Sequence, residues 1–191
     1  MLKTLHVEDK KVTKIYITKA IVESIMEASL VEDKIIVDDQ PSIDRLHQKG
    51  FGKKVEDELE LSLLEGLFLL ERESLKIFEN KKEVAKKDIL KRVEEKEFML
   101  RYRVYKDLRE RGYIVKTGFK FGAHFRVYER GEFLTEHSKY LVHAVPENYV
   151  ISFPEMARAI RLTQGVKKKI MFAVVDDEGD ITYYMVERIT P

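Results

Sequence analysis

Residues 113–128 read YIVKTGFKFGAHFRVY, and this stretch decides the fold class of the C-terminal half of the chain. It contains two short runs, Tyr113–Thr117 and His124–Tyr128, in which apolar and polar side chains alternate. A period of two, with β-branched and aromatic residues, is typical of strands. Gly118 ends the first run, and Gly131 follows shortly after the second. The stretch therefore predicts two consecutive short strands.

The residues after this pair predict a helix and three more strands. A strand over Lys139–Val145 ends at Pro146. Ser152-Phe-Pro-Glu155 is a capping-box pattern with proline in the first turn, and it begins a helix that ends near Gln164. The last two strands are expected at 169–175 and 181–189, joined by a hairpin turn with the sequence Asp-Asp-Glu-Gly-Asp.

The residues before the pair predict one long helix. From Asp88 to Arg111, apolar side chains recur along one side of a highly charged stretch, and Gly112 suits the position after the helix end. The charged run is typical of a solvated helix face. These elements give the order α-β-β-β-α-β-β, a compact unit of the α/β (α+β) class that we place at residues 86–191.

The N-terminal part, residues 1–85, is expected to form a small mixed α/β domain. Ser62-Leu-Leu-Glu65 is a second capping box, and it begins an apolar helix that runs through Leu70. The pattern around it predicts strands at 12–17, 34–37 and 75–78, a short helix at 21–30, mostly loop over 38–58, and a turn at 80–82.

Composition excludes several classes of protein. The chain has 191 residues and no cysteine, which excludes disulfide scaffolds, thiolate zinc sites and cysteine nucleophiles. Apolar residues at 44% and aromatic residues at 10% argue against disorder. No apolar run reaches the ~18 residues of a membrane span, and the N-terminus lacks the apolar region of a signal peptide. We expect a soluble, cytoplasmic protein.

The formal net charge of +1 hides a segregation of charge along the chain. Residues 1–100 carry a net charge of −3, residues 101–169 carry +8, and residues 170–191 carry −4. A basic middle and an acidic tail indicate two different partners.

A few side chains are of the types that carry chemistry. Tyr128 ends a predicted strand, His137 lies in a polar connection beside the sheet, and Lys167–Lys169 lie between a helix and a strand. Histidine suits acid–base chemistry, and lysines suit phosphate contacts. Taken singly, each is more typical of a packing or surface residue.

Other chemistries fit less well. The chain has neither a P-loop motif nor a G-x-G-x-x-G motif, and its histidines lack metal-ligand spacing. The acidic run from Asp176 to Glu187 is a poor calcium loop, because Ile181 stands where that loop requires glycine. We expect no metal and no cofactor.

Several motifs, in order and spacing, resemble those of the archaeal tRNA-intron endonucleases of the short-subunit, tetrameric type. The catalytic domain of that family resembles residues 102–191, and its N-terminal domain resembles Leu61–Leu69. The motifs are Tyr105–Gly118, Lys120–Tyr128, His137–Val142, Gly165–Lys169 and the aspartate-rich hairpin.

The resemblance implies a metal-independent RNA endonuclease. Such enzymes cut bulge–helix–bulge motifs in precursor tRNA and leave 2′,3′-cyclic phosphate and 5′-hydroxyl ends. The family's tyrosine in F-R-x-Y falls on Tyr128, its histidine in H-S-x-Y-L-V on His137, and its lysine best on Lys168, with Lys167 and Lys169 one residue away. The implied roles are base, acid and electrostatic stabiliser, respectively.

Two of these assignments stay open from the sequence. A tyrosine hydroxyl ordinarily has a pKa of about 10, so Tyr128 either removes a proton or mainly positions the 2′-hydroxyl. His124 stands where the family usually has aspartate before Phe-Arg, a departure that affects a supporting or RNA contact rather than the three catalytic positions.

The resemblance also implies how the chain contacts RNA and other subunits. Two arginines that sandwich a bulge base map onto Arg161 and Arg188, and an acidic loop that docks between the domains of another subunit maps onto Asp176, Asp177, Glu178 and Asp180. Without an insertion between residues 50 and 62, a homotetramer, a dimer of dimers, is favoured over an assembly of two kinds of chain.

Two alternative functions remain. A non-catalytic structural RNA-binding subunit of a heteromeric splicing endonuclease usually lacks the three catalytic residues, which this chain has. A metal-dependent nuclease of the restriction-enzyme kind requires a P-D…[DE]-x-K pattern, which we do not find.

Overall fold

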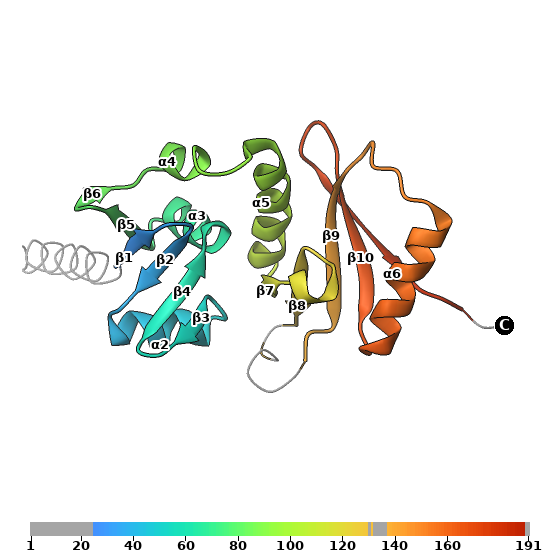
Figure 1. The fold of residues 1–191 in the computed structure, drawn as a ribbon, viewed down its shortest axis with the longest axis horizontal. Helices are drawn as coiled ribbons and strands as arrows, with labels where there is room; N and C mark the ends of the chain where they lie inside the picture. The colour runs from blue at the N-terminus through green and yellow to red at the C-terminus, as the bar shows by residue number, and fades with distance from the viewer. Residues whose placement is uncertain (1–24, 130, 132–136, 190–191) are drawn as a thin grey trace, which may run out of the picture.

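The computed structural model describes residues 25–129, 131 and 137–189, which form two sheets with helices packed against them (Figure 1). The N-terminal sheet has six strands in the order β3-β4-β2-β1-β5-β6, and the C-terminal sheet has five in the order β11-β10-β9-β8-β7. The fold is of the α+β class, as predicted. Across the described ranges, the helices are too short or too polar to span a bilayer.

The N-terminal half combines the first sheet with two helices. Its core consists of apolar side chains from β1, β2, β4 and β5 packed against α3. The elements are β1 Met26–Val31, β2 Lys34–Val37, α2 Gln40–Gln48, β3 Lys53–Val55, β4 Glu58–Ser62, α3 Leu63–Glu71, β5 Leu75–Glu79 and β6 Lys82–Glu83.

The C-terminal half places helices on both faces of the second sheet. In Figure 1, α5 covers one face and α6 lies against the other. The elements are α4 Lys86–Leu90, α5 Glu95–Glu110, β7 Ile114–Thr117, the 3₁₀ turn η1 Phe119–Phe121, β8 Phe125–Tyr128, β9 Tyr140–Pro146, α6 Phe153–Gly165, β10 Lys169–Val175 and β11 Ile181–Val186. From α5 onward, the order of helices and strands is as predicted.

Both predicted capping boxes begin helices. In α3 the Ser62 hydroxyl accepts from the Glu65 amide, and the Glu65 carboxylate accepts from the Ser62 amide at 2.9 Å. In α6 the same reciprocal pair joins Ser152 and Glu155. Two orphan amides of the first turn are thereby satisfied at each helix start.

Two predictions in the N-terminal half are wrong. The segment 26–30, expected in a helix, is in strand β1, whose side chains alternate between buried and exposed and which pairs with β2 and β5. The segment 38–58, expected to be mostly loop, contains α2 and β3. Helix α2 begins where the Asp39 carboxylate accepts from the Ser42 amide at 3.0 Å, with Pro41 in the first turn. The predicted strand at 12–17 lies outside the described residues.

Two boundaries in the C-terminal half also differ. The single helix expected over 88–111 is divided into α4 and α5, because Glu94 adopts an extended conformation and caps α5 through the Glu97 amide at 2.9 Å. Strand β11 ends at Val186 rather than at Ile189, since its partner β10 begins only at Lys169.

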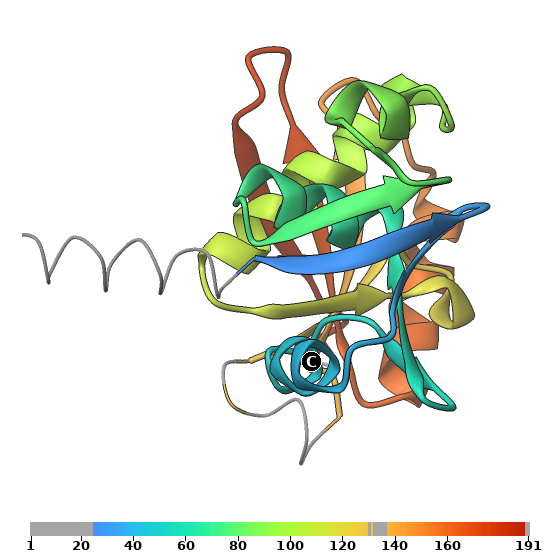
Figure 2. The same ribbon diagram turned by 90° about the vertical axis from the view of Figure 1, so that its left-hand side faces the viewer.

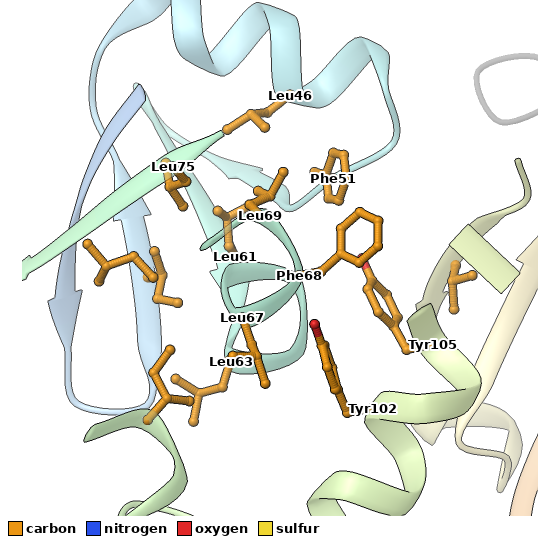
Figure 3. Packing of buried hydrophobic residues seen from close by; sticks show 14 of the residues in the cluster. Leu46, Phe51, Leu61, Leu63, Leu67, Phe68, Leu69, Leu75, Tyr102 and Tyr105 are labelled. Atoms are coloured by element: carbon orange, nitrogen blue, oxygen red, sulfur yellow. The ribbon is translucent and has the colours of Figure 1, made fainter. Parts of the chain in front are cut away.

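Helix α5 connects the cores of the two halves (Figure 3). The Tyr102 hydroxyl donates to the Glu71 carboxylate of α3 at 2.7 Å. The ring of Tyr105 meets Phe68 edge-on at 5.8 Å and Phe125 of β8 at 6.1 Å. The N-terminal half thus packs against the same helix that supports the second sheet.

Glu65 adds a buried polar connection between the halves. Besides its cap, this carboxylate accepts from the Gly52 amide at 2.9 Å and lies 3.4 Å from the amine of Lys116 in β7. Glu65 is 7% exposed. A buried charge needs such partners to offset its desolvation, so the contact fixes β7 relative to α3.

Candidate active site

The strand order brings three predicted site residues to one edge of the second sheet. Strand β8 pairs antiparallel with β9, and β9 pairs parallel with β10. The end of β8 and the beginnings of β9 and β10 therefore meet at the same edge, at the bottom of Figure 1. Tyr128 ends β8, His137 lies three residues before β9, and Lys168 directly precedes β10.

Backbone hydrogen bonds fix the register at this edge. The Lys139 amide donates to the Val127 carbonyl at 3.0 Å, and the Lys169 amide donates to the Lys139 carbonyl at 3.0 Å. The residues next to Tyr128, His137 and Lys168 are thus held in adjacent rows of one ladder. Tyr128 is itself 8% exposed, so its ring is packed into the protein.

The end of α6 places Lys168. The Lys168 amide donates to the Thr163 carbonyl at 2.9 Å, and the Lys167 amide donates to the Gln164 carbonyl at 3.1 Å. With Lys167 at a φ of 54°, this is a Schellman motif whose left-handed position is held by lysine instead of the usual glycine. The motif ends the helix and turns the chain directly into β10.

The side chain of Lys168 points toward the start of β9. Its amine donates to the Ser138 carbonyl at 2.6 Å, whereas Lys167 and Lys169 are exposed. Burial lowers the pKa of the Lys168 amine, and the positive charge of Arg126 lowers it further. Of the three neighbouring lysines, Lys168 is therefore the one whose described side-chain contacts place its amine at this edge of the sheet.

His137 lies at the same edge of the sheet, just before β9. It is exposed, while the adjacent Ser138 is 4% exposed and carries the carbonyl that binds Lys168. The chain enters β9 through a buried residue, so the backbone at His137 is anchored on its C-terminal side. The structure thus places His137 just before β9 with its side chain exposed to solvent.

The two predicted RNA-stacking arginines lie on different elements. Arg161 is exposed on α6, one turn before its end, and borders a cavity of about 580 Å³ with Phe121 and His143. Arg188 is exposed two residues beyond Val186, whose partner Ile170 comes two residues after Lys168. Arg188 is therefore at the same sheet edge as Lys168, and Arg161 lies above it on the helix.

Comparison with known proteins shows which family the chain belongs to. The family model of the tRNA intron endonuclease catalytic C-terminal domain matches residues 98–183, and that of the tRNA intron endonuclease N-terminal domain matches residues 26–90. The chain belongs to the tRNA intron endonuclease family. It is an endonuclease of tRNA splicing.

Three relatives show how far the similarity extends. The tRNA-splicing endonuclease of Thermococcus kodakarensis is 44% identical over 158 residues, covering 81% of this chain and 93% of that protein. The one from Methanothermobacter thermautotrophicus is 43% identical over 168 residues, covering 87% of this chain and 99% of that protein. In the tRNA-splicing endonuclease of Methanococcoides burtonii, which is 39% identical, the match covers 48% of the relative.

The acidic hairpin of this endonuclease lies at the opposite edge of the sheet, and Figure 2 shows it projecting from the body of the protein. Asp176 stiffens it, because its carboxylate accepts from the amides of Gly179 and Asp180, both at 2.7 Å. The nearby charge of Asp177 raises the pKa of Glu147, with smaller contributions from burial and from Asp176. The hairpin thus concentrates negative charge far from the edge that carries Lys168.

A basic cavity of about 620 Å³ lies between the two halves of the endonuclease. The Tyr105 hydroxyl and the Arg101 Nε are buried beside it with no partner among the described residues. The cationic side chains that line it are Lys53, Lys54, Arg101, Lys116 and Arg126. Two carboxylates, Glu60 and Glu65, also line the cavity, and Glu65 lies 3.4 Å from the Lys116 amine.

His124, the departure from the family pattern, acts as a structural acceptor. Its Nδ1 accepts from the Ala144 amide of β9 at 3.0 Å, and its ring meets that of His143 at 5.6 Å. Burial lowers the pKa of His124 to about 4, and the charge of Arg101 contributes to the shift. His124 is therefore neutral near pH 7 and completes the ladder between β8 and β9.

Three residues that lie around the Lys168 side chain were not predicted from the sequence. They are Phe121, whose ring lies next to the Lys168 amine, Arg126, which lies next to the same ring, and Ser138, whose carbonyl binds that amine. Two glycines around Phe121, at 118 and 122, are the sequence signal of a constrained turn there. The described residues contain no group of three or more His, Asp or Glu side chains able to hold a metal ion.

Proposed function

We propose that this endonuclease cuts bulge–helix–bulge motifs in precursor tRNA by metal-independent transesterification. The products are a 2′,3′-cyclic phosphate and a 5′-hydroxyl. The observation that carries the proposal is the meeting of Tyr128, His137 and Lys168 at one sheet edge. A non-catalytic subunit has no need of a base, an acid and a cation at one place.

In the proposed step, the 2′-oxygen attacks the adjacent phosphorus while the bond from phosphorus to the 5′-oxygen breaks. Tyr128, in its deprotonated form, takes the proton of the 2′-hydroxyl, and His137, in its protonated form, gives a proton to the departing 5′-oxygen. Lys168 stabilises the additional negative charge of the phosphorane. Since the 2′-hydroxyl is the nucleophile, no water enters the step, and DNA cannot react.

The unpaired bulge is the part of the substrate that such a site can use. In-line attack requires a nucleotide that can leave the helical stack, which a bulge permits and a duplex does not. Arg161 and Arg188 are exposed near the edge and offer guanidinium planes on which a splayed base can stack. The net charge of +8 over residues 101–169 suits the phosphate backbone.

Cleavage should depend on the bulges rather than on base sequence. We expect an RNA with two three-nucleotide bulges flanking a short helix to be cut once in each bulge. A control RNA in which added complementary nucleotides pair both bulges should be cut at least ~100-fold more slowly, because unstacking a paired base costs a few kcal/mol. Mapping the cuts on end-labelled RNA tests this. Equal cleavage of both RNAs would contradict the proposed substrate.

We also propose that copies of the chain assemble, as a homotetramer, through the acidic hairpin. Its residues Asp176, Asp177, Glu178 and Asp180 complement the basic cavity between the halves of another copy. One chain has one such catalytic edge, whereas two bulges require two. This chain covers 48% of the tRNA-splicing endonuclease of Methanococcoides burtonii. A relative of about twice the matched length supports a catalytic unit that works in pairs.

Reversing the hairpin charge should dissociate the assembly. We expect Asp177→Lys with Glu178→Lys to lower the mass measured by sedimentation, because lysines would face the cationic cavity. Glu27→Lys with Glu73→Lys reverses two exposed acids on the N-terminal half and serves as the matched control. Raising salt from 0.1 to 1 M should weaken the wild-type assembly in the same direction, since the Debye length falls from about 10 to about 3 Å. An unchanged mass in both tests would refute hairpin docking.

A further inference from the structure

Phe121 lies in the turn between β7 and β8, and its ring lies close to the Lys168 amine. It belongs to η1, between Gly118 and Gly122. A Cβ atom on Gly118 would come within 2.8 Å of the Ala123 carbonyl oxygen, and Gly122 has a φ of +65°. Both positions favour glycine for steric reasons, so this turn depends on the two glycines on either side of η1.

Two cations share the ring of Phe121. The Lys168 amine is 5.6 Å from the ring centroid, and the Arg126 guanidinium carbon is 5.8 Å from it. Each cation has one hydrogen bond to the backbone, from Lys168 to the Ser138 carbonyl at 2.6 Å and from Arg126 to the Thr117 carbonyl at 2.9 Å. Like charges repel, and the negative face of an aromatic ring offsets part of that repulsion.

We propose that Phe121 is a positioning residue for Lys168. Its ring, which Arg126 also contacts, holds the Lys168 amine against the Ser138 carbonyl. This inference rests on the proposed function, because it assigns Phe121 a role only through the lysine. The amine has three N–H donors. One is used by Ser138, and the ring restrains the side chain so that the others are directed at the phosphorane. Phe121 therefore affects the chemical step and leaves RNA binding unchanged.

The test is a double-mutant cycle between positions 121 and 168, measured as single-turnover cleavage at saturating enzyme. Phe121→Leu, which keeps an apolar side chain without a ring, should slow cleavage about tenfold, equivalent to about 1.4 kcal/mol. Phe121→Tyr should stay within about twofold of wild type, because it keeps the ring. In the Lys168→Ala background, Phe121→Leu should slow cleavage by less than about a further twofold, since the amine that Phe121 positions is absent. The dissociation constant for RNA should stay constant throughout.

Three results would overturn the inference. A tenfold loss from Phe121→Leu in both backgrounds would mean that the ring acts directly on RNA. Weaker RNA binding by Phe121→Leu at an unchanged cleavage rate would also mean that the ring contacts RNA directly. Wild-type rate and binding of Phe121→Leu would show that Phe121 has no role in positioning Lys168. Wild-type cleavage by Lys168→Ala would instead refute the proposed catalytic edge itself, so the two failures are distinguishable.

Folding of the variants needs its own control. If Phe121→Leu lowers the midpoint of thermal unfolding, a trifluorinated phenylalanine at position 121 replaces it, because this residue keeps the shape of the ring and weakens its negative face. We expect the same loss of rate from this substitution in the wild-type background and none with Lys168→Ala. Full activity of the fluorinated protein would overturn the inference.

Discussion

Replacing His137 by alanine should slow the cleavage step by about 10²- to 10⁴-fold, the range expected for loss of a general acid. His137 is exposed at the edge where β8 ends and β9 begins, so its removal leaves the packed core intact. The dissociation constant for uncleaved RNA should therefore stay within a few-fold of wild type. Single-turnover rates at saturating enzyme, compared with binding measured on a 2′-deoxy substrate, separate the two quantities.

A sulfur leaving group makes this expectation specific for proton donation. In an RNA with sulfur in place of the 5′-bridging oxygen at the cut site, the leaving group departs as a thiolate. A thiolate is a weaker base than an alkoxide, so its departure needs no acid. His137→Ala should cleave this RNA at nearly the wild-type rate. His137→Gln, which keeps a hydrogen-bonding side chain without an imidazole, should behave like the alanine variant on both substrates. A large loss that persists with the sulfur substrate would contradict the assignment of His137 as the acid.

Replacing Lys168 by alanine should lower the cleavage rate by about 10²- to 10³-fold, the effect of removing one preorganised donor from a developing negative charge. The structure provides matched controls in the flanking residues, because Lys167 and Lys169 are exposed lysines of the same chemistry. Lys167→Ala and Lys169→Ala should each weaken RNA binding modestly and reduce its salt dependence. Their rates at saturating enzyme should stay within about threefold of wild type.

Lys168→Arg adds a test of geometry. It retains a positive charge, yet a planar guanidinium does not reproduce the contact of an ammonium with the Ser138 carbonyl. We expect an intermediate rate, between those of wild type and Lys168→Ala. If Lys169→Ala or Lys167→Ala shows the large loss and Lys168→Ala does not, the catalytic lysine has been assigned one residue away from its true position.

Local sequence signals predicted much of the fold because they act within a few residues. The capping boxes at Ser62 and Ser152 and the period of two around Tyr128 and Tyr140 each specify structure without distant partners. Residues 26–30 were wrongly expected in a helix because a short apolar run suits either a helix or a strand. The pairing of β1 with β5, almost fifty residues away, decides the outcome.

The residues of the candidate site were predicted from the family resemblance, because each one alone is more typical of a packing or surface residue. The pairing of β8, β9 and β10 then places Tyr128 and Lys168 at the same end of the sheet. The contacts that position the lysine were not predictable, because Phe121, Arg126 and Ser138 meet only after the sheet has formed. Likewise, Glu65 was recognised as a helix cap, but its contact with Lys116 joins segments fifty-one residues apart.

The most direct test of the central claim is cleavage of a bulge–helix–bulge RNA in excess EDTA, with analysis of both new ends. If Tyr128, His137 and Lys168 supply the base, the acid and the charge stabilisation, the rate with chelator should match the rate with magnesium at equal ionic strength. The products should carry a 2′,3′-cyclic phosphate and a 5′-hydroxyl. An absolute requirement for a divalent metal, or products with 5′-phosphate and 3′-hydroxyl ends, would contradict the account.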